Sequence, residues 1–423
     1  MIDTLLRDIR RQRRTEQMVH APAYNKWIRD SWHPYWVLNA RRTGPTVEQI
    51  MQSRNADLAG LPDKPGEPVL LLGSGPSLDD WRPYIKDWKG DIFCSTSQLA
   101  WLESAGVNPR YVFLIDSDPV MDYLVKQYTP VKGQPIPDFI THPCIQKEAI
   151  QTWGRPEHTW FFRMLDPGDE FFTKFLPMMY HVVNEKKGWG VKTYILNSGC
   201  VMNTMMVFAH QKKYNPIFLC GYDLGYPGGQ YRFQNYKKIK KGKSITWEAE
   251  PILPVPLDRP FKPSHNGVAT DELCLFYKYS SIIMYGMNSN NLLSCSRGTF
   301  DEVPYVSPES VVKTQGRGYE DRMRGPVEAY LIAQKYLQYR KILMLRTGFA
   351  VSVNNTMGMK PLVRLKTVLR WLYWRHRVDW EEQGKWYAKK MMRKRRRKPK
   401  VVKTPYDLSP PSATACLTAS LSS

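Results

Sequence analysis

The chain has 423 residues, a formal net charge of +22 and 42% hydrophobic residues, which is enough to build a large core. No apolar run approaches the roughly 18 residues of a membrane-spanning helix, and the basic stretch RDIRRQRR near the start interrupts any apolar segment of a secretion signal. The seven cysteines include no CxxC pair, so the composition argues against a secreted disulfide framework or a zinc site and predicts a cytoplasmic protein with reduced thiols.

The first 66 residues predict a basic, aromatic-rich extension. Residues 3–19, DTLLRDIRRQRRTEQMV, have the pattern of a basic amphipathic helix. Residues 59–68, AGLPDKPGEP, have the proline and glycine content of a linker. We therefore expect a first segment over residues 1–66 and the start of a folded domain at residue 67.

Residues 67–315 alternate short apolar runs with longer mixed segments. This alternation predicts strands and helices in turn, and hence an α/β, Rossmann-like fold with a mostly parallel sheet covered on both faces. The expected strands are 69–73, 91–96, 110–115, 137–141, 159–163, 192–196 and 216–221. The expected helices are 78–88, 97–105, 119–128, 169–180, 199–213, 271–286 and, beyond the domain, 327–341.

Residues 227–266 interrupt this alternation with Gly, Pro, Lys and Tyr. A loop this long in a compact domain is usually a lid or a binding insertion. Its lysines suit either a cover over an anionic donor or a solvated basic loop. They are Lys237, Lys238, Lys240, Lys241 and Lys243.

The C-terminal part is strongly basic. Residues 361–400 hold fifteen Lys and Arg against three acidic residues and so carry +12 of the net charge. The expected helical region 316–400 therefore suits an anionic partner, either nucleic acid or the inner membrane surface, where the protein would be peripheral. Docking of its aromatic residues against the core is a further alternative, and residues 401–423 are expected to be disordered.

Two glycines and a proline follow the first predicted strand in VLLLGSGPSLDDW, residues 69–81. Gly73 and Gly75 let the backbone approach a ligand closely, while Pro76 suits a first helical turn and Ser77 a cap. The free amides around Ser74 and the start of a helix favour a bound anion. The motif lacks the third glycine of a dinucleotide fingerprint and the lysine of a P-loop, so a tight turn without ligand is the alternative.

Three blocks of the chain resemble a known family. The first is LLGSGPSLDDWRPYIKDWKGDIFCSTSQLAWLESAGVNPRYVFLIDSDP, the second is residues 197–226 and the third is residues 266–298. In this order they are similar to the family of MptE-type 6-hydroxymethylpterin diphosphokinases and bacterial motility accessory factors, and the glycine turn also resembles that of bacterial CMP-sialyltransferases. The resemblance covers roughly residues 68–313 and implies a Rossmann-like domain that holds a nucleotide by its phosphates, without choosing between diphosphate transfer and glycosyl transfer.

Polar residues follow several predicted strands, where ligands bind in an open α/β sheet. Thr96 and Ser97 can bind ribose or base, or Ser97 can cap the next helix. Asp116 and Asp118 can hold Mg²⁺ on a diphosphate, bind ribose hydroxyls or close a turn.

Further candidates lie in the second half of the domain. The start of the helix at 199–213 offers another anion-competent site in its backbone amides. Asp223 ends a strand at the same edge and suits a substrate contact, an N-cap or a loop salt bridge. His142 and His265 are candidates for the general base that glycosyl transfer needs, or structural histidines. The residues expected at the helix start are Asn197, Ser198 and Gly199.

We therefore expect a nucleotide-dependent transferase of this family. Of its possible reactions we favour glycosyl transfer from a nucleotide-activated sugar to an acceptor that the sequence does not identify. His265, Asp223 and His142 are its expected catalytic residues, and Mg²⁺ is an optional cofactor. The first alternative is an ATP-dependent diphosphokinase acting on a hydroxymethylpterin-like acceptor. The second is a non-enzymatic protein that binds nucleic acid or a membrane surface.

Overall fold

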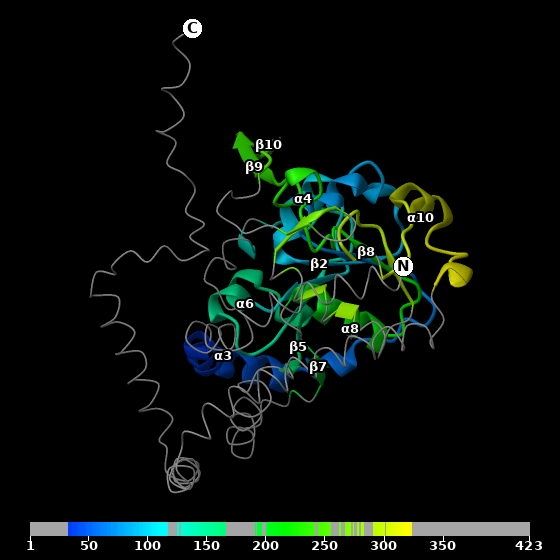
Figure 1. Ribbon diagram of the computed structural model, residues 1–423. Helices are drawn as coiled ribbons and strands as arrows, with labels where there is room; N and C mark the ends of the chain where they lie inside the picture. Colours follow the sequence, from blue (N-terminus) through cyan, green and yellow to red (C-terminus); the bar gives the residue numbers. More distant parts are fainter. Residues whose placement is uncertain are drawn as a thin grey trace, which may run out of the picture. The chain divides into compact units, whose positions relative to one another are not determined.

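A seven-stranded sheet forms the core of the described part of the chain (Figure 1). The computed structural model describes residues 33–116, 125–126, 128–165, 191, 193–196, 200–241, 244–254, 262–263, 267–271, 274, 277–278, 281–282, 291–300 and 302–323. The strand order is β13-β8-β1-β2-β3-β4-β5, and every pairing in the sheet is parallel. The expected Rossmann-like α/β fold is confirmed. The strands are β1 (Val69–Leu72), β2 (Asp91–Ser95), β3 (Tyr111–Leu114), β4 (Asp138–Thr141), β5 (Thr159–Phe161), β8 (Ile217–Cys220) and β13 (Leu292–Ser294).

The strands of this sheet are apolar because both faces are covered. All four residues of β1, β3 and β8 are buried, as expected for parallel strands packed on two sides. Helix α8 (Val201–Gln211) packs on β1 and β3. Its Phe208 ring lies 5.5 Å from Phe93 and 5.2 Å from Tyr111, in an aromatic cluster that fixes the helix to the sheet.

The helices differ from expectation where proline intervenes. The predicted helix at 78–88 is instead two 3-10 helices, η2 (Pro76–Trp81) and η3 (Ile85–Asp87), because Pro83 between them has no N–H to continue a helix. The prediction at 97–105 corresponds to η4 (Thr96–Gln98) followed by α4 (Leu99–Ser104). The predictions at 169–180 and 327–341 lie outside the described residues, as does 119–128 apart from residues 125, 126 and 128. The described residues of 271–286 that are helical are 274, 277, 278, 281 and 282.

The aromatic segment before the sheet packs into the same core. Helix α3 (His33–Ser53) buries Trp36, Ala40 and Val47 in the hydrophobic cluster that includes the central strands. It contacts α6 (Lys147–Trp153), which lies beside it in Figure 1. Part of the aromatic content of the predicted extension therefore covers the sheet domain, while residues 1–32 and 324–423 lie outside the described residues.

The insertion at 227–266 forms strands that the sequence did not predict. β9 (Tyr236–Lys241) and β10 (Ser244–Ala249) pair as an antiparallel hairpin that contacts α4 (Figure 1). Lys238 Nζ lies 2.5 Å from the Glu103 carboxylate of α4 and 5.6 Å from the Trp247 ring. These contacts attach the hairpin to the domain, so the expected loop contains ordered strands in its described residues. Its expected role as a lid or a binding insertion stays a prediction.

The remaining elements are short. The predicted strand 192–196 forms β7 (Tyr194–Leu196), which pairs with β6 (Arg163–Leu165) outside the main sheet. Within the described residues, no helix is both long enough and apolar enough to cross a bilayer. The other elements are η1 (Leu58–Gly60), η5 (Pro156–His158), η7 (Pro227–Gly229), β11 (Lys262–Pro263), β12 (Ala269–Thr270), α10 (Pro308–Thr314) and η8 (Glu320–Arg322).

Candidate functional site

The strand order reverses direction at β1. From β1 the chain adds β2 to β5 on one side, whereas β8 and β13 lie on the other side. In open parallel sheets, ligands bind beyond the carboxyl ends of the strands at such a switch point. The glycine turn of residues 73–77 follows β1, and residues 221–223 follow β8, so both segments lie at this switch point.

The two loops at the switch point are in direct backbone contact. The amide of Gly73 donates to Cys220 O and that of Gly75 to Gly221 O, each at 2.7 Å. A Cβ atom on Gly75 would lie 2.7 Å from Gly221 O and would also collide with the Asp223 carboxylate. Glycine is required at residue 75 because another part of the chain occupies the space beside it.

Asp223 occupies the helix start that the sequence suggested for an anion. Its Oδ2 atom accepts the Ser77 amide at 2.8 Å, and its Oδ1 atom accepts the Ser77 hydroxyl. The Arg297 amide in turn donates to Ser77 Oγ at 2.8 Å. The side chain of Asp223 is almost completely buried, and this burial raises the pKa of its carboxyl group to about 6, against the lowering effect of the Ser77 hydrogen bonds.

This carboxylate thus acts as an internal lock between the two loops. The amides of Gly73, Gly75 and Ser77 all donate within the chain, so they are not available to phosphate oxygens. The expectation that these amides form an open cradle is not supported by this geometry. Asp223 likewise faces the inside of the turn rather than a solvent-filled crevice, which does not favour the catalytic role expected of it.

The outer side of the turn is formed by Ser74, which is exposed. Its Oγ atom accepts the Gln98 Nε2 amide at 2.7 Å, which leaves the hydroxyl hydrogen free to donate outward. Gln98 is held in place because its Oε1 atom accepts the amide and the hydroxyl of Ser95, each at 2.8 Å. Within the described part of the chain, no acceptor engages the Ser74 amide. The turn therefore presents two donors, one from the backbone and one from the side chain.

The other predicted residues after β2 and β3 differ in accessibility. Ser97 is half-buried beside the turn, and its amide donates to Ser95 Oγ at 3.3 Å. Thr96 is buried, which does not favour a contact with ribose or base. Asp116 is half-buried after β3.

Several predicted residues cannot be placed at this edge. Asp118, Asn197, Ser198, Gly199 and His265 lie outside the described residues. The magnesium site expected at Asp116 and Asp118 therefore stays a prediction. Among the described residues, no group of three or more His, Cys, Asp and Glu side chains is arranged around a common metal position.

His142 is a buried histidine with both ring nitrogens engaged. The Cys144 amide donates to Nδ1 at 3.2 Å, so the ring proton is on Nε2 and donates to Ile115 O at 2.9 Å. Burial lowers the pKa of the ring to about 4, partly opposed by the hydrogen bond to Ile115. This geometry gives His142 a structural role and does not support its expected role as general base.

One charged residue at this edge was not predicted from the sequence. Arg297 follows β13, and its side chain, 57% exposed, forms an ion pair with Asp80 at 2.8 Å. Its backbone position is fixed by the hydrogen bond to Ser77. The third block of the resemblance includes this residue as its last but one, but a lone arginine after a strand carries no local signal of a binding role. Arg297 lies close to the glycine turn because β13 places it there, and the sequence did not predict β13.

Residues 44–229 match the family model described as "6-hydroxymethylpterin diphosphokinase MptE-like". The resemblance inferred from the sequence motifs is therefore confirmed for this part of the chain, which includes the glycine turn and Asp223. A comparison with curated proteins found no matching relative.

The chain is also similar to a solved structure, that of MAf glycosyltransferase from Magnetospirillum magneticum AMB-1. The sequence identity is 16%, the TM-score is 0.40, and the match covers 69% of this chain. It spans 42% of the length of that glycosyltransferase, so less than half of that protein has a counterpart here.

Proposed function

We propose that this protein is a nucleotide-dependent transferase that binds its donor on the outer side of the glycine turn. The observation that carries this proposal is the position of Ser74. Its amide and hydroxyl are held as donors at the switch point of a parallel sheet, where ligands of this fold class bind. The match of residues 44–229 to the MptE-like family supports a transferase.

Glycosyl transfer from a nucleotide-activated sugar is the reaction we favour. Two accessible side chains beside the turn are neutral, namely the hydroxyls of Ser74 and Ser97. Such groups suit the hydroxyls of ribose and sugar. Arg297 is the cation nearest to the turn, and a diphosphate bound here would compete with Asp80 for its guanidinium. His265 stays our candidate for the general base that removes the proton of the acceptor hydroxyl.

A diphosphokinase is the second candidate, because the description of the matched family names that activity. It would transfer a pyrophosphoryl group from ATP to a hydroxymethyl acceptor and would use Mg²⁺, with Asp116 and Asp118 as its ligands. Activity that a chelator abolishes and Mg²⁺ restores favours this candidate. Activity that a chelator leaves unchanged favours metal-free glycosyl transfer.

Donor binding is tested by thermal unfolding of the full chain with CMP, UDP, GDP or ATP, each with and without Mg²⁺. A nucleotide at ten times its Kd stabilises the folded state by about 1.4 kcal/mol, which raises the Tm. We expect at least one nucleotide to do so. If none raises the Tm at millimolar concentration, the proposal of a nucleotide-dependent transferase is wrong.

The position of the site is tested with two serine variants. Ser74→Ala removes the outward hydroxyl and is expected to weaken nucleotide binding about tenfold, as for the loss of one hydrogen bond to a charged group. Ser104→Ala is the matched control, because it also removes one hydrogen bond, to Trp101 O at 2.8 Å. Ser104 ends α4, which starts at the carboxyl edge and leads away from it. Equal effects of the two variants would place the nucleotide elsewhere.

A further inference from the structure

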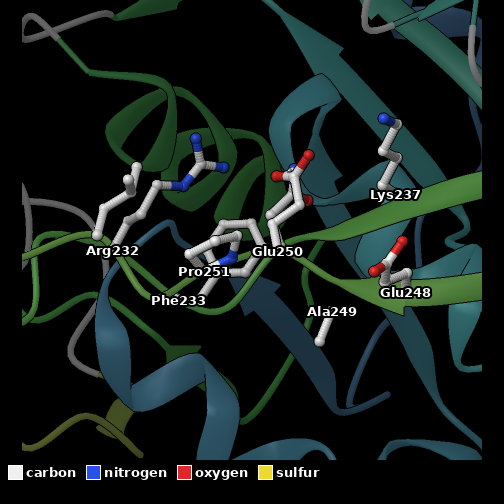
Figure 2. A pocket seen from close by; sticks show the side chains of 9 residues that line it. Arg232, Phe233, Lys237, Glu248, Ala249, Glu250 and Pro251 are labelled. Carbon is white, nitrogen blue, oxygen red and sulfur yellow. Dashed lines mark hydrogen bonds between the residues drawn. The ribbon is translucent and has the colours of Figure 1, made fainter. Parts of the chain in front are cut away.

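A pocket of about 450 Å³ lies at the base of the β9–β10 hairpin (Figure 2). One wall comes from residues 232–237 and the other from residues 248–253. In the view of Figure 2, Glu250 lies between Arg232 on one side and Lys237 and Glu248 on the other. Charged side chains of both signs therefore surround the pocket.

Backbone hydrogen bonds hold both walls in place. The Glu250 amide donates to Asn235 O, and the Tyr231 amide donates to Leu253 O, each at 2.9 Å. On the side of the sheet, the Phe233 amide donates to Ser74 O at 3.3 Å, and the Gln234 amide donates to both oxygens of Asp79 at 2.9 and 3.0 Å. The pocket is thus formed by ordered backbone fixed to the glycine turn.

Two polar atoms of the pocket are buried without a hydrogen-bond partner among the described residues. They are the Nε atom of Arg232, which is a donor, and the Oδ1 atom of Asn235, which is an acceptor. The other half of the Asn235 amide is used, since Nδ2 donates to Glu250 Oε2 at 2.8 Å. A buried polar group without a partner costs about 1–3 kcal/mol, so a ligand that supplied partners to these two atoms would recover that free energy on binding.

Arg232 is oriented for this role by its neighbours. Its guanidinium group lies over the Phe233 ring at 4.7 Å from the ring centre. Burial lowers the pKa of this guanidinium, and the charge of Glu250 opposes that shift. A stacked guanidinium with a free Nε–H can bind an anionic group through Nε and one terminal nitrogen together.

The acceptors of the pocket complete the description of the ligand. Asn235 Oδ1 and the Glu250 carboxylate require hydroxyl or amine hydrogens from the ligand. We propose that this pocket binds a small polyhydroxylated molecule that carries one anionic group, with the anion on Arg232 and hydroxyl groups on Asn235 and Glu250. The anionic group is a carboxylate or a phosphate, both of which match a guanidinium. This site does not depend on the proposed transfer reaction.

The test measures binding to the full chain by isothermal titration with four probes of similar size. Glucuronate and glucose 6-phosphate carry the anionic group, glucose is neutral, and glucosamine is cationic. At least one of the two anions is expected to bind at least tenfold more tightly than glucose and glucosamine, and the stronger of the two identifies the acid. Equal binding of all four probes, or no binding of either anion at millimolar concentration, overturns the proposal.

Variants locate the binding in the pocket. Arg232→Gln is expected to abolish the preference for the anion, and Arg232→Lys to lose most of it, because lysine keeps the charge without the paired N–H groups. Lys240→Gln is the control, since Lys240 is an exposed cation of the same hairpin that does not line the pocket. The Tm of each variant without ligand serves as the check of folding and is expected to match that of the unmodified protein. Retained preference in Arg232→Gln, or equal loss in Lys240→Gln, overturns the assignment.

Discussion

Asp223→Asn replaces the buried carboxyl group with an amide of nearly the same shape, and we expect it to change how stability depends on pH. In the folded protein the carboxylate accepts two hydrogen bonds from Ser77, but burial raises its pKa from 3.8 to about 6. The folded state therefore binds the Asp223 proton more tightly than the unfolded state does. This proton contributes stability that is complete below the unfolded pKa and is lost as the pH rises through the folded pKa.

The magnitude follows from the two pKa values. Over the full range the shift corresponds to about 3 kcal/mol, at about 1.36 kcal/mol per unit. Between pH 5, where the folded carboxyl group is mostly protonated, and pH 7.5, where it is ionised, linkage gives a loss of about 1.4 kcal/mol. The amide of the Asp223→Asn variant does not ionise, so the free energy of unfolding of this variant, relative to the unmodified protein, is expected to rise by this amount from pH 5 to pH 7.5.

Urea unfolding of both proteins at several values of pH measures this difference, and the effects of all other carboxylates cancel in the comparison. Asp63→Asn is the control, because Asp63 is exposed and the hydrogen bond from Lys213 lowers its pKa. The pKa of Asp63 lies below 4 in both states. The difference in the free energy of unfolding between Asp63→Asn and the unmodified protein is therefore expected to stay constant from pH 5 to pH 7.5. If this difference is also constant for Asp223→Asn, the inference that the Asp223 carboxylate is desolvated in the folded state is refuted.

Three further predictions concern the turn, the buried histidine and the basic tail. Gly75→Ala is expected to lower the free energy of unfolding by at least about 2 kcal/mol through overpacking against the Asp223 loop. Gly133→Ala is the control, because Gly133 has open space around it at φ +83°, and it should lower the free energy of unfolding by about 1 kcal/mol. Equal losses of the two variants in urea unfolding would contradict this prediction. His142→Phe is expected to cost about 3 kcal/mol by leaving the partners of both ring nitrogens unpaired, and an unchanged urea midpoint would contradict the structural role. Replacing the six basic residues 393–398 with Gln is expected to weaken the free energy of binding to phosphatidylserine vesicles, measured by sedimentation, by about 1 kcal/mol per charge. The nucleotide-induced rise in Tm is expected to persist. Undiminished sedimentation would exclude this segment as the membrane contact.

The strands of the sheet could be predicted because their signal is local. The runs VLLL and IFLC are apolar at every residue, as burial on both faces of a parallel sheet requires. β13 has three residues, Leu292–Ser294, and becomes a strand because β8 offers a free edge beside it. The hairpin strand YKKIKK has the charge content of a loop, and its order depends on tertiary contacts such as that of Lys238 with Glu103.

The role of the glycine turn could be predicted only in part, because half of its partners are far away in the sequence. The glycines were expected to let the backbone approach a ligand, and in the structure they let it approach another part of the chain. That group proved to be the loop after β8, whose Asp223 lies 146 residues from Ser77 along the chain. No pattern within the turn distinguishes a carboxylate of the same chain from a phosphate of a ligand, since both satisfy the same amides.

The lock at Asp223 divides the glycine turn into two sides with different functions. The inner amides hold the loops of β1 and β8 together, and the outer side presents Ser74 at a fixed position. A phosphate bound at this edge would therefore meet one backbone amide and one hydroxyl rather than a ring of amides. Most of its charge would have to be balanced by side chains. The nearest cation is Arg297, whose backbone amide bonds to Ser77 and whose guanidinium would be shared between the phosphate and Asp80. Recognition at this site is accordingly expected to depend on side-chain identity, so that a substitution at Ser74 or Arg297 changes affinity without unfolding the turn.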